Sequence, residues 1–139
     1  MALIDTGPLV ALAIPHDPRH ATAWRAVNGL PGPLTTTWAV ATEVLHFLGD
    51  RAGGWHGQAP FVALVRGGRL SVADFTLPLG LRSLELIEQY ADAPMDLADA
   101  SLVALGEARW DYRVVTFDAD FRFFRAAGGL SFTVLDGSS

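Results

Sequence analysis

The first twelve residues constrain the fold of this chain more than any other stretch. Ala2–Ile4 is a short apolar run that ends in the carboxylate of Asp5, and a Thr-Gly-Pro segment separates it from a second apolar run, Leu9–Leu12. The first run predicts a buried strand, and the second predicts the start of a helix after a turn. In open α/β sheets, ligands bind beyond the carboxyl ends of the strands, which is where Asp5 is expected. A carboxylate at the end of a buried strand is costly unless something pairs with it, and a metal ion would satisfy that need.

The rest of the chain alternates between segments with strand and helix patterns. Further strands are expected at Leu34–Thr37, Leu70–Phe75, Arg113–Phe117 and Phe132–Leu135. Helices are expected at His20–Val27, Trp38–Leu48, Ala59–Arg66, Leu79–Tyr90, Leu97–Arg109 and Ala119–Ala127, with a glycine-rich break at Asp50–Gly57. This alternation predicts an α/β fold, a three-layer α/β/α sandwich with a central, mainly parallel sheet. No segment reads as a long linker, so we expect residues 1–139 to form a single domain.

Composition narrows the classes of function. The net charge is −5, which argues against a generic electrostatic binder of nucleic acid but not against an enzyme that presents carboxylates to a metal ion and meets phosphates through that ion. All ten basic residues are arginines, and the absence of lysine excludes P-loop nucleotide hydrolases and receiver domains, which by resemblance would need a functional lysine.

Without cysteine there is no disulfide framework or thiolate metal site, so a cytoplasmic protein is expected. No apolar run approaches the ~18 residues of a membrane span, so no membrane association is expected. Half of the residues are hydrophobic, which is high for so small a domain and leads us to expect a homodimer.

Glu43 is the most informative acidic residue after Asp5. It lies within an apolar stripe at helical spacing that includes Val40, Val44 and Phe47. Such a carboxylate either occupies a partly exposed edge of the helix or points inward toward a cation.

The other acidic residues considered for the site lie near the starts of predicted helices or the ends of predicted strands. In the segment PMDLADASLVAL, Asp96 is placed to cap a helix, whereas Asp99 shares a helix face with apolar residues and is expected to point toward the sheet. Asp118 follows a β-branched strand, which repeats the pattern at Asp5, and Asp120 comes two residues later. Helix capping is the alternative role for both. Asp74 also follows a strand, and the pattern alone does not exclude it.

The chemistry of this set points to a hard cation. Ligand sets rich in oxygen and without sulfur suit Mg²⁺ or Mn²⁺ over zinc. Several carboxylates around one or two such ions indicate metal-assisted hydrolysis of phosphodiesters.

The order of four segments resembles the PIN-domain ribonuclease family. These segments are LIDTGPLVAL, TTTWAVATEVL, PMDLADASLVAL and VVTFDADF. The length of the chain and the motifs DASLVAL and TFDADF resemble those of the VapC-type toxins of bacterial toxin–antitoxin pairs. The resemblance covers nearly the whole chain and implies a PIN-like fold. Matched residue by residue, it places the metal-site and catalytic acids on Asp5, Glu43, Asp99 and Asp118. Thr6 and Thr116 match the accompanying hydroxyls, Asp96 and Asp120 match positions that are often acidic, and Asp74 matches none.

The resemblance also implies an activity and partners. It implies an Mg²⁺- or Mn²⁺-dependent endoribonuclease that cuts RNA to leave a 5′-phosphate and a 3′-hydroxyl, is dimeric, and is silenced by a cognate antitoxin protein. Two other functions remain open, a catalytically degenerate PIN fold that binds RNA or protein and a metal-dependent phosphatase. The candidate RNA-binding residues are all arginines, each of which could instead be a solvated surface residue: Arg51, Arg109, Arg113, Arg122 and Arg125.

Overall fold

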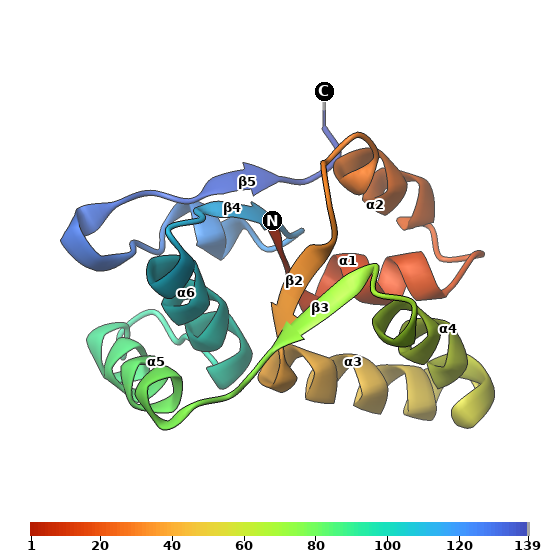
Figure 1. Ribbon diagram of the computed structural model, residues 1–139, viewed down its shortest axis with the longest axis horizontal. Helices are drawn as coiled ribbons and strands as arrows, with labels where there is room; N and C mark the ends of the chain where they lie inside the picture. Colours follow the sequence, from red (N-terminus) through yellow and green to blue (C-terminus); the bar gives the residue numbers. More distant parts are fainter. Residues whose placement is uncertain (139) are drawn as a thin grey trace.

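A computed structural model describes residues 1–138 and contains one sheet of five strands (Figure 1). The strands are β1 (Leu3–Ile4), β2 (Leu34–Thr37), β3 (Leu70–Ala73), β4 (Arg113–Val115) and β5 (Thr133–Leu135). Their order is β3-β2-β1-β4-β5, and every pairing is parallel. The shortest strand, β1, lies at the centre, where Leu3 is opposite both Thr35 of β2 and Val114 of β4.

Helices cover both faces of this sheet. They are α1 (Thr6–Ala13), α2 (His20–Val27), α3 (Trp38–Arg51), α4 (Trp55–Arg66), α5 (Leu77–Gln89) and α6 (Leu97–Arg109). Figure 1 shows α5 and α6 on one side of the sheet, α1, α2 and α4 on the other, and α3 running from the end of β2. The predicted three-layer sandwich with a parallel sheet is therefore confirmed. Within residues 1–138, no helix has both the length and the apolar character that crossing a membrane requires.

The two central strands are held by apolar burial, and β2 adds buried hydroxyl groups. Leu3, Ile4, Val114 and Val115 are completely buried, as are all three threonines of β2. The hydroxyl of Thr36 donates to the carbonyl oxygen of Ile4 at 2.8 Å. Because a buried hydroxyl costs little once it is hydrogen-bonded, these threonines are tolerated in the core and link neighbouring strands.

Helix α6 lies between the sheet and α5 and is buried along most of its length. A Cβ atom on Gly106 would lie only 3.2 Å from Cδ1 of Leu3 and 2.9 Å from the carbonyl oxygen of Asp111. The glycine therefore allows α6 to approach the central strand closely. This approach brings the first turn of α6, with Asp99, to the carboxyl edge of the sheet.

Three elements have the predicted bounds, most of the others differ from their predicted bounds by a few residues, and one expected break is much shorter. The helices His20–Val27 and Leu97–Arg109 and the strand Leu34–Thr37 have the predicted bounds. The glycine-rich break, expected over Asp50–Gly57, is confined to residues 52–54, because Gly53 and Gly54 alone reverse the chain with φ angles of 96° and 63°.

The helix predicted at Ala119–Ala127 is wrong. A 3-10 turn, η1 (Ala119–Arg122), forms there instead, and a second 3-10 turn, η2 (Ala127–Gly129), begins at the last predicted position. Phe121 and Phe124 are both buried, and this spacing of three residues suits a 3-10 turn. The guanidinium of Arg125 donates to the carbonyl oxygens of the three preceding residues, which an α-helix would satisfy with backbone N–H groups.

Candidate metal centre

Asp5 lies directly after β1 and is the most deeply buried acidic residue among those described, at 7% exposure. Its backbone N–H donates to the carbonyl oxygen of Val115 at 2.9 Å, which fixes it beside the end of β4. One carboxylate oxygen accepts from the Thr6 N–H at 2.8 Å and the other from the Thr116 hydroxyl at 2.9 Å. Asp5 therefore caps α1 while its carboxylate is held at the carboxyl edge of the sheet.

Three carboxylates converge at this edge. Asp5, Asp99 and Asp118 each offer an oxygen atom, and these atoms all lie within 4.8 Å of one another. Asp99 comes from the first turn of α6, and Asp118 follows β4 and caps η1 through the N–H of Asp120 at 2.9 Å. One side chain fixes two of the three acids, because the Thr116 hydroxyl donates to Asp5 and accepts from the N–H of Asp118 at 3.0 Å.

Burial, with a smaller contribution from neighbouring negative charges, raises the pKa values of Asp5 and Asp99. Burial raises the pKa of Asp5, although the hydrogen bonds from Thr6 and Thr116 act in the opposite direction. Burial is also the main cause at Asp99, and the negative charges of Asp96, Asp5 and Asp118 add to it, raising the pKa of Asp99 to about 8. The first turn of α6 thus carries an acid that resists ionisation unless a cation is near.

Glu43 lies beside this cluster. The Thr6 hydroxyl donates to Oε1 of Glu43 at 2.7 Å, so Thr6 contacts Asp5 through its backbone and Glu43 through its side chain. The residue is exposed, and partial burial of its carboxyl group still raises its pKa, with Asp96 and Asp5 adding to the effect. Of the two positions considered from the sequence, Glu43 takes the exposed edge of the helix while its carboxyl group faces the acidic cluster.

The three other acidic candidates occupy different places. Asp96 is exposed and caps α6, accepting from the Asp99 N–H at 2.8 Å. Asp120 is exposed in η1. Asp74 lines a shallow hollow with residues of the C-terminal half of α6, including Glu107 and Arg109, whereas Asp99 lies in the first turn of that helix.

The five arginines expected to bind RNA are mostly engaged elsewhere. Arg113 pairs with Asp111, Arg122 pairs with Asp136, and Arg125 is bonded to backbone carbonyls. Arg51 lies over the ring of Phe47, and Arg109 lines the hollow beside Asp74. The sequence analysis missed Arg19, which stacks on Phe117, the residue before Asp118. No sequence signal marks Arg19, because its neighbour lies 98 positions away in the chain.

The donor atoms suit a hard divalent cation. Asp5, Asp99 and Asp118 present carboxylate oxygens only, the ligands that Mg²⁺ and Mn²⁺ prefer. A cation there would also offset the mutual repulsion that raises the pKa of Asp99. The cluster is thus able to hold a metal ion, and the ligand role of each individual residue stays a prediction.

The raised pKa of Asp99 predicts how stability depends on pH when divalent metal is removed. The pKa of Asp99 is about 8 in the folded protein and about 3.8 ordinarily, so the folded state holds this proton more tightly than the unfolded chain does. The free energy of unfolding is therefore highest below about pH 4 and falls as the pH rises toward 8. In EDTA, Asp99→Asn should therefore be more stable than wild type at pH 8.5, by about 1–2 kcal/mol after allowance for solvent screening. The advantage should shrink toward pH 4.5. Chemical denaturation across this range measures the effect, with Asp74→Asn as control, and two parallel pH profiles would contradict it.

Comparison with known proteins identifies the family of this chain. Residues 2–127 match the family model of the PIN domain, whereas a search of curated protein sequences gives no match. Among solved structures, the crystal structure of VapC20 from Mycobacterium tuberculosis, a toxin that cleaves the sarcin–ricin loop, is 24% identical with a TM-score of 0.80, covering 94% of this chain and 97% of that chain.

Two further structures come from toxin–antitoxin pairs. A chain of a toxin–antitoxin complex from Klebsiella pneumoniae is 20% identical with a TM-score of 0.69, covering 100% of this chain and 99% of that chain. VapBC2 from Rickettsia felis, bound to a DNA fragment from its promoter, is 14% identical with a TM-score of 0.69, covering 97% and 98%. These likenesses establish a shared fold, and the family model spans nearly the whole sequence. The resemblance found in the sequence is therefore confirmed, and the chain belongs to the PIN domain family.

Proposed function

We propose that this protein is an Mg²⁺- or Mn²⁺-dependent endoribonuclease that hydrolyses RNA phosphodiester bonds, and that it is the toxin of a VapBC-type toxin–antitoxin pair. One observation carries the proposal, the convergence of oxygen atoms of Asp5, Asp99 and Asp118 within 4.8 Å at the sheet edge of a PIN domain. The structural neighbours support the finer assignment, since they include a toxin that cleaves the sarcin–ricin loop and two toxin–antitoxin assemblies.

In this proposal each side chain has a defined task. Asp5, Asp99 and Asp118 hold the metal, and Glu43 supplies a fourth carboxylate on the exposed side of the cluster. A bound Mg²⁺ or Mn²⁺ supplies Lewis acidity, which lowers the pKa of a water molecule and offsets charge on the scissile phosphate. The hydroxyls of Thr116 and Thr6 keep Asp5 and Glu43 in place through bonds of 2.9 and 2.7 Å.

The two other functions are less well supported. A PIN fold that binds RNA or protein without cutting it has no need of three converging carboxylates, one of them with a pKa of about 8. A phosphatase for small phosphoesters would use the same acids, and a chromogenic phosphate monoester tested beside RNA separates the two activities.

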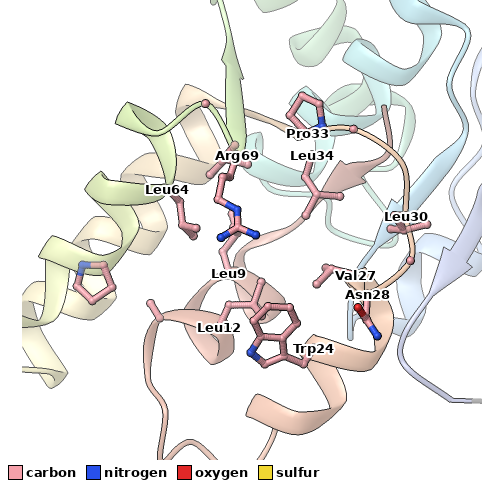
Figure 2. Close-up of a pocket in the computed structure, with 16 residues that line it drawn as sticks. Leu9, Leu12, Trp24, Val27, Asn28, Leu30, Pro33, Leu34, Leu64 and Arg69 are labelled. Atoms are coloured by element: carbon pink, nitrogen blue, oxygen red, sulfur yellow. The ribbon is translucent and has the colours of Figure 1, made fainter.

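An antitoxin partner needs a place to bind, and one hollow in residues 1–138 is the candidate that we consider. It measures about 530 Å³ and lies between α1, α2 and α4, near the amino ends of β2 and β3. Figure 2 shows Trp24, Leu64 and Arg69 directed into this hollow. We propose that an apolar segment of the antitoxin binds there, with an acidic residue facing Arg69. The site would lie away from the acidic cluster, which is at the carboxyl edge.

A second apolar surface suits the expected homodimer. Leu77, Leu81 and Leu84 follow one another at helical spacing on α5, and each is more than half exposed. Leu97, at the start of α6, is exposed as well. We propose that two copies of the chain pair through this leucine face of α5, because a self-complementary apolar stripe is what a two-fold dimer requires.

The nuclease assignment predicts metal-dependent cleavage of RNA. Purified protein should cut single-stranded RNA with Mg²⁺ or Mn²⁺ and stop in EDTA. Asp99→Asn should lower the rate by about 100-fold or more, the scale seen when one group that stabilises transition-state charge is removed. Asp74→Asn, the matched control at a carboxylate outside the cluster, should keep nearly full activity. Undiminished cleavage in EDTA, or equal losses in both variants, would refute the metal mechanism.

The antitoxin proposal is tested with the product of any small reading frame that sequencing finds directly upstream of the gene. Trp24→Ala should weaken its binding by about tenfold or more, because a buried aromatic anchor is typical of binding hot spots. Trp55→Ala removes another exposed tryptophan, one that does not line the hollow, and should have little effect. Isothermal titration calorimetry measures both affinities. Equal affinities for the two variants would place the antitoxin elsewhere.

The dimer proposal is tested by light scattering at micromolar concentration. The wild type should be at least a dimer, and Leu81→Arg should be a monomer because it places charges against each other at the two-fold contact. Leu130→Arg, at an exposed leucine outside the stripe, should remain a dimer. A wild-type monomer would rule the leucine face out as the contact between copies.

A further inference from the structure

The guanidinium of Arg19 lies over an aromatic ring that borders the candidate metal centre in the chain. Its Cζ atom is 3.9 Å from the centroid of the Phe117 ring. Phe117 stands between Thr116, whose hydroxyl bonds to Asp5, and Asp118, whose oxygen joins the cluster. Arg19 precedes α2, so the stack joins the loop before α2 to the end of β4.

Contacts with α1 hold both Phe117 and the loop that carries Arg19 in place. A Cβ atom on Gly7 would lie 3.3 Å from Cδ2 of Phe117, so the ring packs closely against the start of α1, two residues after Asp5. On the other side, the Arg19 N–H donates to the Asp17 carboxylate at 2.7 Å, and Nδ1 of His20 lies 2.7 Å from the carbonyl oxygen of Ala11. The loop that carries Arg19 is thus tied to α1, the helix that Asp5 caps.

The charge of Arg19 is available for a ligand. Its side chain is exposed, and in residues 1–138 it forms no ion pair, in contrast to Arg82, Arg113 and Arg122. A guanidinium that stacks on a ring keeps its N–H groups in the plane, where they can bind two oxygens of one phosphate. Arg19 covers one face of the Phe117 ring. That face therefore holds the guanidinium in place and is not free to stack on an RNA base.

We propose that Arg19, ordered by Phe117, binds an RNA phosphate next to the one at the acidic cluster and so positions the strand for cleavage. The inference rests on the proposed RNA substrate. An acidic chain of net charge −5 that gathers carboxylates at its active centre repels a polyanion. A cation held on Phe117, the residue before Asp118, would offset that repulsion at the neighbouring phosphate without entering the metal site. Arg19 is in this sense a positioning residue.

The test is the binding of fluorescein-labelled single-stranded RNA to protein carrying Asp99→Asn, measured by anisotropy over a range of salt concentrations. Adding Arg19→Ala should raise Kd several-fold and reduce the slope of log Kd against log salt by about 0.7, the value for one phosphate contact on a single strand. Arg19→Lys should recover part of the affinity, because it keeps the charge but not the planar geometry. Phe117→Leu should weaken binding less than Arg19→Ala, and the double variant should show less than the sum of the two effects.

Arg66→Ala is the matched control. It removes the same charge from an exposed position at the end of α4, just before the amino end of β3. It should leave Kd and the salt slope nearly unchanged. Equal effects from Arg66→Ala and Arg19→Ala would mean that only net charge matters and would overturn the proposal, as would an unchanged slope in Arg19→Ala. Thermal melting confirms that each variant is folded.

Cleavage assays distinguish failure of this inference from failure of the proposed function. In protein with Asp99 intact, Arg19→Ala should raise KM more than it lowers kcat, since the contact is made in the ground state and the transition state alike. If wild type cleaves RNA with metal but Arg19→Ala has the same KM and salt slope, only the role of Arg19 is wrong. If wild type binds RNA through Arg19 but does not cleave it, the nuclease function fails and the binding site stands. If it neither binds nor cleaves RNA, both fail.

Discussion

The parallel pairing of β1 with β4 is the interaction on which the rest of the site depends. Both strands are short, the paired residues Leu3, Ile4, Val114 and Val115 are completely buried, and this pairing places Asp5 beside Thr116 and Asp118 at one edge of the sheet. Each strand is followed by a carboxylate because the chain leaves the sheet there and enters a helical turn that the carboxylate caps. The same two acids therefore end strands, begin helical turns and form the cluster.

Hydroxyl groups determine how closely the acids approach one another. Thr116 and Thr6 bond to Asp5 and Glu43, and deeper in the core the hydroxyl of Thr37 lies 2.7 Å from that of Ser101. Thr37 also caps α3, which carries Glu43, while Ser101 follows Asp99 in α6. The helices that bring these two acids are thus linked by a neutral contact beneath them. Neutral donors can order carboxylates without cancelling their charge, which leaves that charge for a cation.

The sequence predicted those features of the fold and the site that depend on residues close together in the chain. Asp5, Asp99 and Asp118 could be found because each follows a strand or shares a helix face with apolar residues, and both patterns lie within a few positions. The short strand β1 and the helix of Leu97–Arg109 could be found for the same reason. The 3-10 turn at Ala119–Arg122 could not, because side chains of Phe121 and Arg125 outcompete local helix propensity there. Nor could Arg19, because its position depends on packing between distant segments.

The order of the strands also determines when the site can form during synthesis. Asp5 emerges from the ribosome early, but the Thr116 hydroxyl that holds it lies 111 positions later in the chain. The central strand β1 lacks one of its two neighbours until β4 has been made. Contacts between such distant residues form late and slowly, because closing a long loop costs entropy before any contact forms. A nascent chain therefore exposes single carboxylates without a cluster. The complete acidic cluster can form only after β4 and Asp118 have left the ribosome.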